Sequence, residues 1–383
     1  MDFRLSDEQE AFLDTARAFA AAEMAPHAER WDAAKEFPAA TLRRAAALGF
    51  AAIYTGEARG GAGLGRLDAA LIFEELARAC PSTAAYISIH NMVAWMIDRF
   101  GDEVQKTRFL PRLVTMDAFA SYALTEPGAG SDAAGLRTKA VRDGDGYVLD
   151  GTKAFISGGG RSDLYLVMAR TGGAGPKGIS SFLVEAGTPG LSYGGQEQKM
   201  GWNSQPTCQV RFDGCRVPLS HRLGAEGEGF KIAMAGLDGG RVNIAACSLG
   251  GAAAALAQAR AYVGEREQFG RPIRDFQSTQ FKLADMATEL EAARLLTWRA
   301  AAAMDAGEPE RTVACAMAKR FATDAGFRIV DEALQLFGGY GYIRDYGIER
   351  LLRDLRVHRI LEGTNEIMRL IIARHLLEDG ARV

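Results

Sequence analysis

The sequence changes in character at Tyr122-Ala123-Leu124-Thr125-Glu126-Pro127-Gly128-Ala129-Gly130-Ser131-Asp132. Pro-Gly and Gly-Ser-Asp let a backbone turn and expose consecutive amides, which can bind an anion or the edge of a polar ring. The alternative is an ordinary surface turn, because glycine-rich turns are common. Taken alone, the stretch favours the turn, so the surrounding sequence has to decide.

On the N-terminal side of this stretch the sequence predicts helices. Ser6 followed by Gln9 is a candidate capping box, and apolar residues then recur at helical spacing. Residues 68–79 are rich in alanine and leucine and end before Cys80-Pro81, which predicts a second helix. Residues 102–115 predict a third helix, disturbed by Pro111.

On the C-terminal side, as far as about Phe230, short apolar runs alternate with glycine. Tyr147–Leu149 and Lys153–Ile156 flank Asp150-Gly151, which predicts a two-residue hairpin. Further strands are predicted at 164–168, 180–184 and 209–212. Several short strands with frequent turns indicate a compact β-barrel or sandwich.

Beyond Gly229 the pattern is helical again, with helices predicted at 241–263, 277–306, 310–336 and 365–377. The order α, then β, then α lacks βαβ alternation, which argues against a Rossmann fold. The predicted fold class is α+β multidomain. It has a helical N-terminal domain (1–120), a middle β domain (121–229) and a helical C-terminal domain (230–383).

Composition narrows the function classes. The 383 residues carry a net charge of −3 and no dense Lys/Arg block, so neither nucleic acid nor a membrane is an expected partner. No stretch is expected to span a bilayer, and the acidic N-terminus indicates no targeting segment. Five scattered cysteines and no His-Glu-x-x-His argue against disulfides and metal, and favour a reducing cytoplasm.

Four more motifs carry candidate functional residues. Phe155-Ile156-Ser157 can place a ring and a hydroxyl against a flat ligand, or end a strand with a core Phe. Arg266 can hold a diphosphate, or be a solvated charge. Gln335–Gly341 permits close backbone approach, or caps a helix.

The fourth is Leu361-Glu362-Gly363-Thr364-Asn365-Glu366. Thr364 or Asn365 can N-cap the last helix. Glu362 follows Ile360-Leu361 and could lie in an apolar pocket with a raised pKa, as a base requires, although a lone glutamate is far more often a surface residue.

The order and spacing of these motifs resemble the acyl-CoA dehydrogenase family across nearly the whole chain, on residues 124–132, 266–277 and 335–369. The resemblance implies a C-terminal four-helix bundle, a homotetramer, and FAD held between the β domain and the bundle. It also implies acyl-CoA as substrate and electron-transfer flavoprotein as the electron acceptor.

The resemblance assigns roles to individual residues. The implied cofactor contacts are Tyr122, Leu124, Thr125, Gly130, Ser131, Phe155, Ile156, Ser157, Arg266, Gln268, Phe269, Phe276, Gln277, Gln335, Leu336, Phe337, Gly338, Gly339, Thr364, Asn365 and Glu366, with the sets at 266–269 and 335–339 serving a neighbouring subunit. The implied substrate contacts are Ser131, Asp238, Arg241, Glu362 and Gly363.

The implied reaction is α,β-dehydrogenation of a thioester, with Glu362 taking the α proton and flavin N5 the hydride. Some relatives carry the base immediately before the arginine that matches Arg241, but that position is Gly240 here. Residues 200–207, 239–245 and 361–363 resemble the branch that acts on isobutyryl-CoA. Butyryl-CoA or 2-methylbutyryl-CoA dehydrogenation, an acyl-CoA oxidase, and a non-oxidising acyl-CoA or flavin binder remain alternatives.

Overall fold

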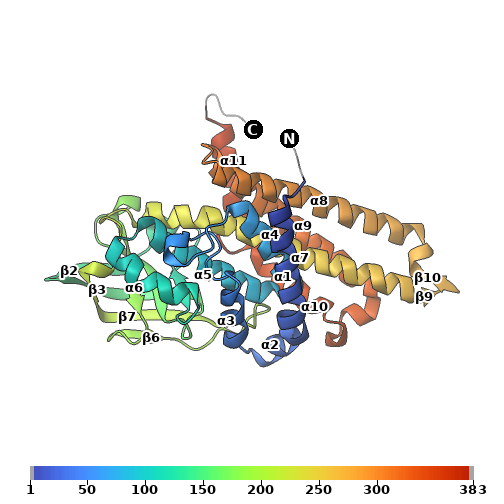
Figure 1. Cartoon of the computed structure of the whole chain (residues 1–383), viewed down its shortest axis with the longest axis horizontal. Helices are drawn as coiled ribbons and strands as arrows, with labels where there is room; N and C mark the ends of the chain where they lie inside the picture. The colour runs from blue at the N-terminus through green and yellow to red at the C-terminus, as the bar shows by residue number, and fades with distance from the viewer. Residues whose placement is uncertain (1–3, 379–383) are drawn as a thin grey trace.

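The computed structural model describes residues 4–378, so Met1–Phe3, part of the N-terminus expected to lack a targeting signal, lie outside the described residues. Helices form the N-terminal and C-terminal parts of the chain, and most strands lie in the part between them (Figure 1). The first set of α-helices is α1 (Asp7–Phe19), α2 (Ala28–Ala34), α3 (Ala39–Ala47), α4 (Arg66–Ala79), α5 (Pro81–Phe100) and α6 (Glu103–Val114). The second set is α7 (Gly229–Glu265), α8 (Gln277–Asp305), α9 (Arg311–Phe337), α10 (Ile348–Arg356) and α11 (Asn365–Leu376).

Two helices of the first set begin at capping boxes. Ser6 and Gln9 form the predicted capping box at the start of α1, with the Gln9 amide donating to the Ser6 hydroxyl at 3.2 Å. Asp102 and Gln105 form a second box at α6. Pro111 lies inside α6, which continues to Val114, so it does not divide the helix.

The middle region is one sheet in the order β6-β7-β3-β2-β4-β5-β8, with β1 paired to β4. Its strands are β1 (Ala120–Ala123), β2 (Lys139–Asp143), β3 (Gly146–Ser157), β4 (Leu164–Arg170), β5 (Ile179–Glu185), β6 (Leu191–Tyr193), β7 (Thr207–Pro218) and β8 (Arg222–Leu223). In a flat sheet β3 and β5 would lie about 14 Å apart. The rings of Tyr147 on β3 and Phe182 on β5 are 4.9 Å apart, so the sheet curls on itself around an apolar core.

The predicted hairpin at Asp150-Gly151 is wrong. β3 runs through these residues, and its register against β7 shifts between Leu149 and Gly151, which marks a bulge. The turn lies earlier, between Asp143 and Gly146, where Gly144 has φ +57°. Gly151 is needed for another reason, because a Cβ there would lie 2.6 Å from the Thr138 hydroxyl.

Helix α7 is the central element of the molecule. It runs from the β domain into the bundle and packs against α4, α5, α8 and α9 (Figure 1). Contrary to the sequence expectation, α7 is long and apolar enough to cross a membrane by length and composition, with a mean hydropathy of 1.4 in its most apolar window. However, 78% of that window is buried inside the protein, as in a core helix.

Candidate functional site

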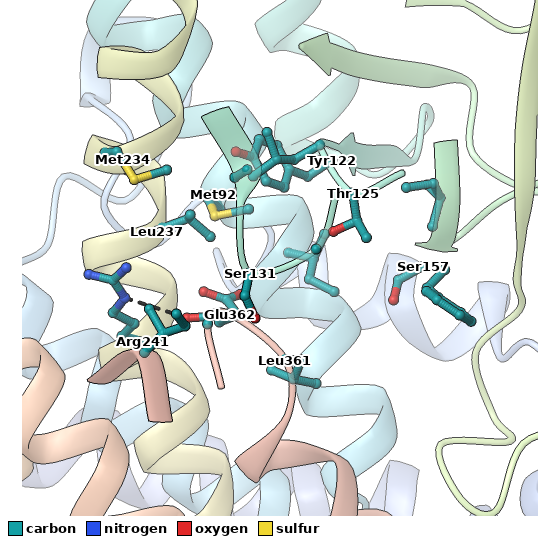
Figure 2. Close-up of a pocket in the computed structure, with 18 of the residues that line it drawn as sticks. Met92, Tyr122, Thr125, Ser131, Ser157, Met234, Leu237, Arg241, Leu361 and Glu362 are labelled. Atoms are coloured by element: carbon teal, nitrogen blue, oxygen red, sulfur yellow. Dashed lines mark hydrogen bonds between the residues drawn. The ribbon is translucent and has the colours of Figure 1, made fainter. Parts of the chain in front are cut away.

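A cavity of about 310 Å³ lies where the β domain meets α5, α7 and the loop before α11. Figure 2 shows the Glu362 carboxylate near its centre, with Ser131 beside it and Tyr122, Thr125 and Ser157 around it. The predicted residues that line this cavity are Tyr122, Leu124, Thr125, Gly130, Ser131, Phe155, Ile156, Ser157, Arg241, Glu362 and Gly363. Segments that are far apart in the chain therefore build one site.

Glu362 has the environment that the sequence predicts for a base. Its Oε2 is buried and has no hydrogen-bond partner within residues 4–378. Burial raises the pKa of the carboxyl to about 7, against the opposing charges of Arg241 and Lys319. Glu362 is also held at φ +55°, a left-handed conformation that is uncommon for a residue with a side chain.

Gly240 makes room for this carboxylate. A Cβ built on Gly240 would lie 2.0 Å from Glu362 Oε2, far inside contact distance. The space that a side chain at position 240 would fill is therefore occupied by the Glu362 carboxylate. The backbone of α7 and the side chain of Glu362 fit together only because residue 240 is glycine.

Arg241 holds the segment that carries Glu362. Its Nε donates to the Glu362 carbonyl at 3.4 Å, and its Nη1 donates to Asp238 Oδ1 at 2.7 Å. Thr312 donates to the other oxygen of Asp238 at 2.7 Å. Asp238 does not line the cavity, and its carboxylate accepts from the Arg241 guanidinium.

The loop from Leu124 to Asp132 is anchored by a buried ion pair. Lys153 Nζ, fully buried, donates to Glu126 Oε1 at 2.8 Å and to the Leu124 carbonyl at 2.9 Å. Glu126 also accepts from the backbone amides of Arg137 and Thr138 at 2.6 and 2.8 Å. Opposite charge and these hydrogen bonds outweigh burial and hold the pKa of Glu126 below its usual value, whereas burial lowers the pKa of Lys153 to about 8.

Replacing Lys153 by Met should destabilise the fold by about 3 kcal/mol, because it leaves a buried carboxylate without its cation. Urea denaturation measures the loss. Lys139→Met, at an exposed lysine on β2, is the matched control and should change stability by less than about 0.5 kcal/mol. Equal losses in the two variants would show that the ion pair contributes nothing.

Several features of the cavity suit a planar, polar-edged cofactor such as the flavin expected from the sequence. The Phe155 side chain is 66% exposed and its residue has φ +57°, so an aromatic face is presented rather than packed. The Tyr122 hydroxyl is buried without a partner in the described chain. A Cβ on Gly128 or Gly130 would meet nothing within 4 Å, so the glycine loop is open to a ligand.

The residues expected to contact the cofactor of a neighbouring subunit, here called the second set, lie outside this cavity. Arg266, Gln268 and Gln335–Gly339 line a cavity of about 480 Å³ beyond the C-terminal end of α9, beside β9 (Glu267–Gln268) and β10 (Arg271–Pro272). Lys319 contacts the Glu362 segment, and about 27 Å of α9 then separates it from Phe337. In Figure 1 this end of the bundle points away from the sheet.

Other residues of the second set do not line either cavity. Phe269 is 94% exposed, and its ring lies 6.2 Å from that of Phe276. Gln277 is exposed at the start of α8. One copy of the chain therefore does not bring this set to the cavity that contains Glu362.

The segment after Gly363 only partly matches its predicted role. Of the two predicted N-cap candidates, Thr364 rather than Asn365 caps α11, by accepting from the Ile367 amide at 3.3 Å. Asn365 is buried away from the cavity and donates to Thr323 and Asp324, both at 2.9 Å. Glu366 is exposed and does not line the cavity either. In this chain the amide of Asn365 is occupied by α9 and is not presented to a cofactor.

The apolar wall of the cavity is made by Ile89, Met92, Trp202, Phe230, Met234, Leu237, Leu361 and Ile367, and sequence reasoning pointed only to Leu361 as part of an apolar pocket. Most of these have no local signal, because an apolar residue on a helix reads as core. Trp202 lies within residues 200–207, which carry part of the family resemblance. Its φ of +56° and its indole hydrogen bond to His358 (3.1 Å) show a fixed position.

Comparison with known proteins agrees with this site. The N-terminal, middle and C-terminal domain models of acyl-CoA dehydrogenase match residues 6–117, 121–215 and 227–377. The mitochondrial isobutyryl-CoA dehydrogenase of Bos taurus is 56% identical over 98% of this chain and 90% of its own, and that of Dictyostelium discoideum is 57% identical over the same shares. The structure of butyryl-CoA dehydrogenase from Megasphaera elsdenii superposes with a TM-score of 0.96 at 42% identity, covering 99% of this chain and 100% of that one. The fold, the three matched domains and the relatives together show that this chain belongs to the acyl-CoA dehydrogenase family, whose members are FAD-dependent enzymes.

Proposed function

We propose that this protein dehydrogenates isobutyryl-CoA at its α and β carbons, with Glu362 as the base. The observation that carries the proposal is the buried, unpaired Glu362 carboxylate, whose raised pKa of about 7 suits proton abstraction near neutral pH. Two relatives that are named for isobutyryl-CoA and share more than half of this sequence support the acyl group. The apolar side chains of Met92, Met234 and Leu237 offer a surface for a short branched chain (Figure 2).

The residues of the chain explain how an α proton could be removed. The α C–H of a thioester is a very weak acid, so its carbonyl must be polarised as the proton leaves. The Glu362 amide makes no hydrogen bond within the described chain and is free to donate to that carbonyl. Entry of an apolar acyl group displaces water from around Glu362 and increases the basicity of its carboxylate.

The cofactor supplies the other half of the chemistry: FAD, when bound, accepts the hydride from the β carbon. Phe155, Ser157, Tyr122 and the loop of Thr125–Ser131 would hold its flavin, because these residues line the cavity around Glu362. Arg266, Gln268 and Gln335–Gly339 would contact the FAD of a neighbouring subunit, since they lie at the far end of the bundle.

The proposed assembly rests on where these two sets of cofactor contacts lie. A homotetramer would bring the second set of residues to a neighbour's cofactor, which a single chain does not do.

Electron-transfer flavoprotein would take the electrons onward, as the family resemblance implies. A cytoplasmic location is also proposed, and the five cysteines, all free and buried, agree with a reducing compartment.

Anaerobic mixing of the purified holoenzyme with isobutyryl-CoA, butyryl-CoA, 2-methylbutyryl-CoA and isovaleryl-CoA tests the substrate. We expect flavin absorbance to bleach fastest with isobutyryl-CoA. The preference over a thioester with one more or one fewer methylene should be about 10- to 200-fold, the range that an apolar pocket can provide. Faster bleaching with another thioester would make its acyl group the proposed substrate, and no bleaching with any of them would refute dehydrogenation.

A further inference from the structure

Two buried cations bind successive carbonyl groups of the dipeptide that carries the base. Arg241 Nε donates to the Glu362 carbonyl at 3.4 Å, and Lys319 Nζ donates to the Gly363 carbonyl at 2.7 Å. Both residues of the dipeptide are left-handed, with φ +55° at Glu362 and φ +85° at Gly363. Glycine adopts this conformation readily, but at Glu362 it costs about 1–3 kcal/mol and persists only where surrounding contacts impose it.

Lys319 is an unusual residue for such an anchor. Its side chain is fully buried on α9, and no carboxylate lies within ion-pairing distance of it in residues 4–378. Its two acceptors are neutral, namely the Gly363 carbonyl and Asn365 Oδ1 at 3.0 Å. A buried cation with only neutral acceptors is costly, so packing alone does not explain a lysine at this position.

The charges around the pair identify its anionic counterpart. The ionisable groups that influence Lys319 are Glu362, Arg241, Asp324 and Glu366, and those that influence Glu362 are Arg241 and Lys319. His358 also faces Lys319, but burial lowers its pKa to about 3, so it is neutral near pH 7. Tyr54, Tyr122 and Cys247 also face Glu362, but burial raises the pKa of each, so they stay neutral near pH 7. After burial, Glu362 is the strongest influence on Lys319, although the two side chains form no direct ion pair.

The two groups titrate in the same range. Burial lowers the pKa of Lys319 from 10.5 to about 7, and burial raises the pKa of Glu362 from 4.5 to about 7. Near neutral pH the protonation of one group therefore depends on the other. Loss of the charge on Lys319 would favour the protonated form of Glu362, which cannot act as a base.

We propose that Lys319 is the positioning residue of the base: its ammonium group holds the Glu362–Gly363 dipeptide in its left-handed conformation, and its charge stabilises the Glu362 carboxylate. This inference rests on the proposed role of Glu362. Asn365 contributes by accepting from Lys319 and donating to Asp324, both on α9, which links the start of α11 to the same anchor.

The test compares Lys319→Met with wild-type holoenzyme in the pH profile of flavin reduction by isobutyryl-CoA. The rate should rise with pH as Glu362 loses its proton, and in Lys319→Met this rise should move to higher pH by about one unit. The limiting rate at high pH should also fall, because the dipeptide loses an anchor. Lys319→Gln, which keeps a donor but not the charge, should show the same shift with a smaller fall in limiting rate.

A second readout does not depend on turnover. The infrared difference spectrum between each protein and its Glu362→Gln counterpart isolates the Glu362 carboxyl, and its titration should show the same shift in the apoprotein. Arg294→Met is the matched control, since it removes a cation that pairs with the buried Glu74 away from the cavity, and it should lower stability without moving the titration.

The outcomes separate the two proposals. An unmoved pH profile and an unmoved carboxyl titration in Lys319→Met would overturn the role of Lys319, even if its stability fell. An active Glu362→Gln enzyme would instead overturn the base itself. A shift in Lys319→Met that is absent from Arg294→Met, together with an inactive Glu362→Gln, is the result that supports both.

Discussion

Glu362→Gln should abolish dehydrogenation, with a fall of about 10²–10⁴-fold or more in the rate of flavin reduction by acyl-CoA. The amide keeps the size and the buried position of the side chain but cannot accept the α proton. Anaerobic stopped-flow mixing measures the rate, and bound FAD is followed by its absorbance. Glu103→Gln, at an exposed carboxylate on α6, is the control and should react as the wild type does.

The same substitution should stabilise the folded protein at neutral pH. The Glu362 carboxyl titrates near 4.5 in an unfolded chain and near 7 in the fold, so the folded state binds this proton more tightly. Wild-type stability relative to Glu362→Gln should therefore decrease as pH rises from about 4.5 to about 7. The same difference in free energy of unfolding between the two proteins at pH 5 and at pH 8 would contradict a buried carboxylate.

The regular spacing of apolar residues predicted most of the helices. The helix predicted at 277–306 is α8 (Gln277–Asp305), which buries Met286, Leu290 and Ala293 on one side. The hairpin at Asp150-Gly151 failed because Asp-Gly also suits a bulge, and the contact of Gly151 with Thr138 is tertiary. Local sequence reports that a backbone will bend there, but the neighbouring strand decides how.

The site was less accessible to local reasoning. The pattern around Glu362 predicted a cap at Thr364 or Asn365, and Thr364 provides it. The placement of Glu362 itself depends on Gly240 and Lys319 from two other helices. Asn365 shows the opposite case, since a motif position implied a cofactor contact and the structure buries it against α9. The spacing of nearby residues predicts neither the placement of Glu362 nor the burial of Asn365, because both arise from how the helices pack.

Gly240→Ala should lower the rate of flavin reduction about 100-fold, although alanine is a better helix former than glycine. The added methyl would lie 2.0 Å from Glu362 Oε2 and 2.6 Å from its Cδ, so the carboxylate has to move. A displacement of about 1 Å at a reacting group is enough for such a loss. The measurement is the limiting rate of flavin reduction by isobutyryl-CoA.

Two comparisons determine whether the loss acts through the base. Gly251→Ala adds a methyl 2.5 Å from Leu355 Cδ1, elsewhere on α7, so it should reduce stability but leave the rate per folded molecule intact. In a Glu362→Gln background the Gly240→Ala change should cost almost nothing further, because residues that act as a unit are not additive. If Gly240→Ala instead slowed Glu362→Gln by the same factor as it slowed the wild type, the methyl would be acting on cofactor or substrate binding rather than on the carboxylate.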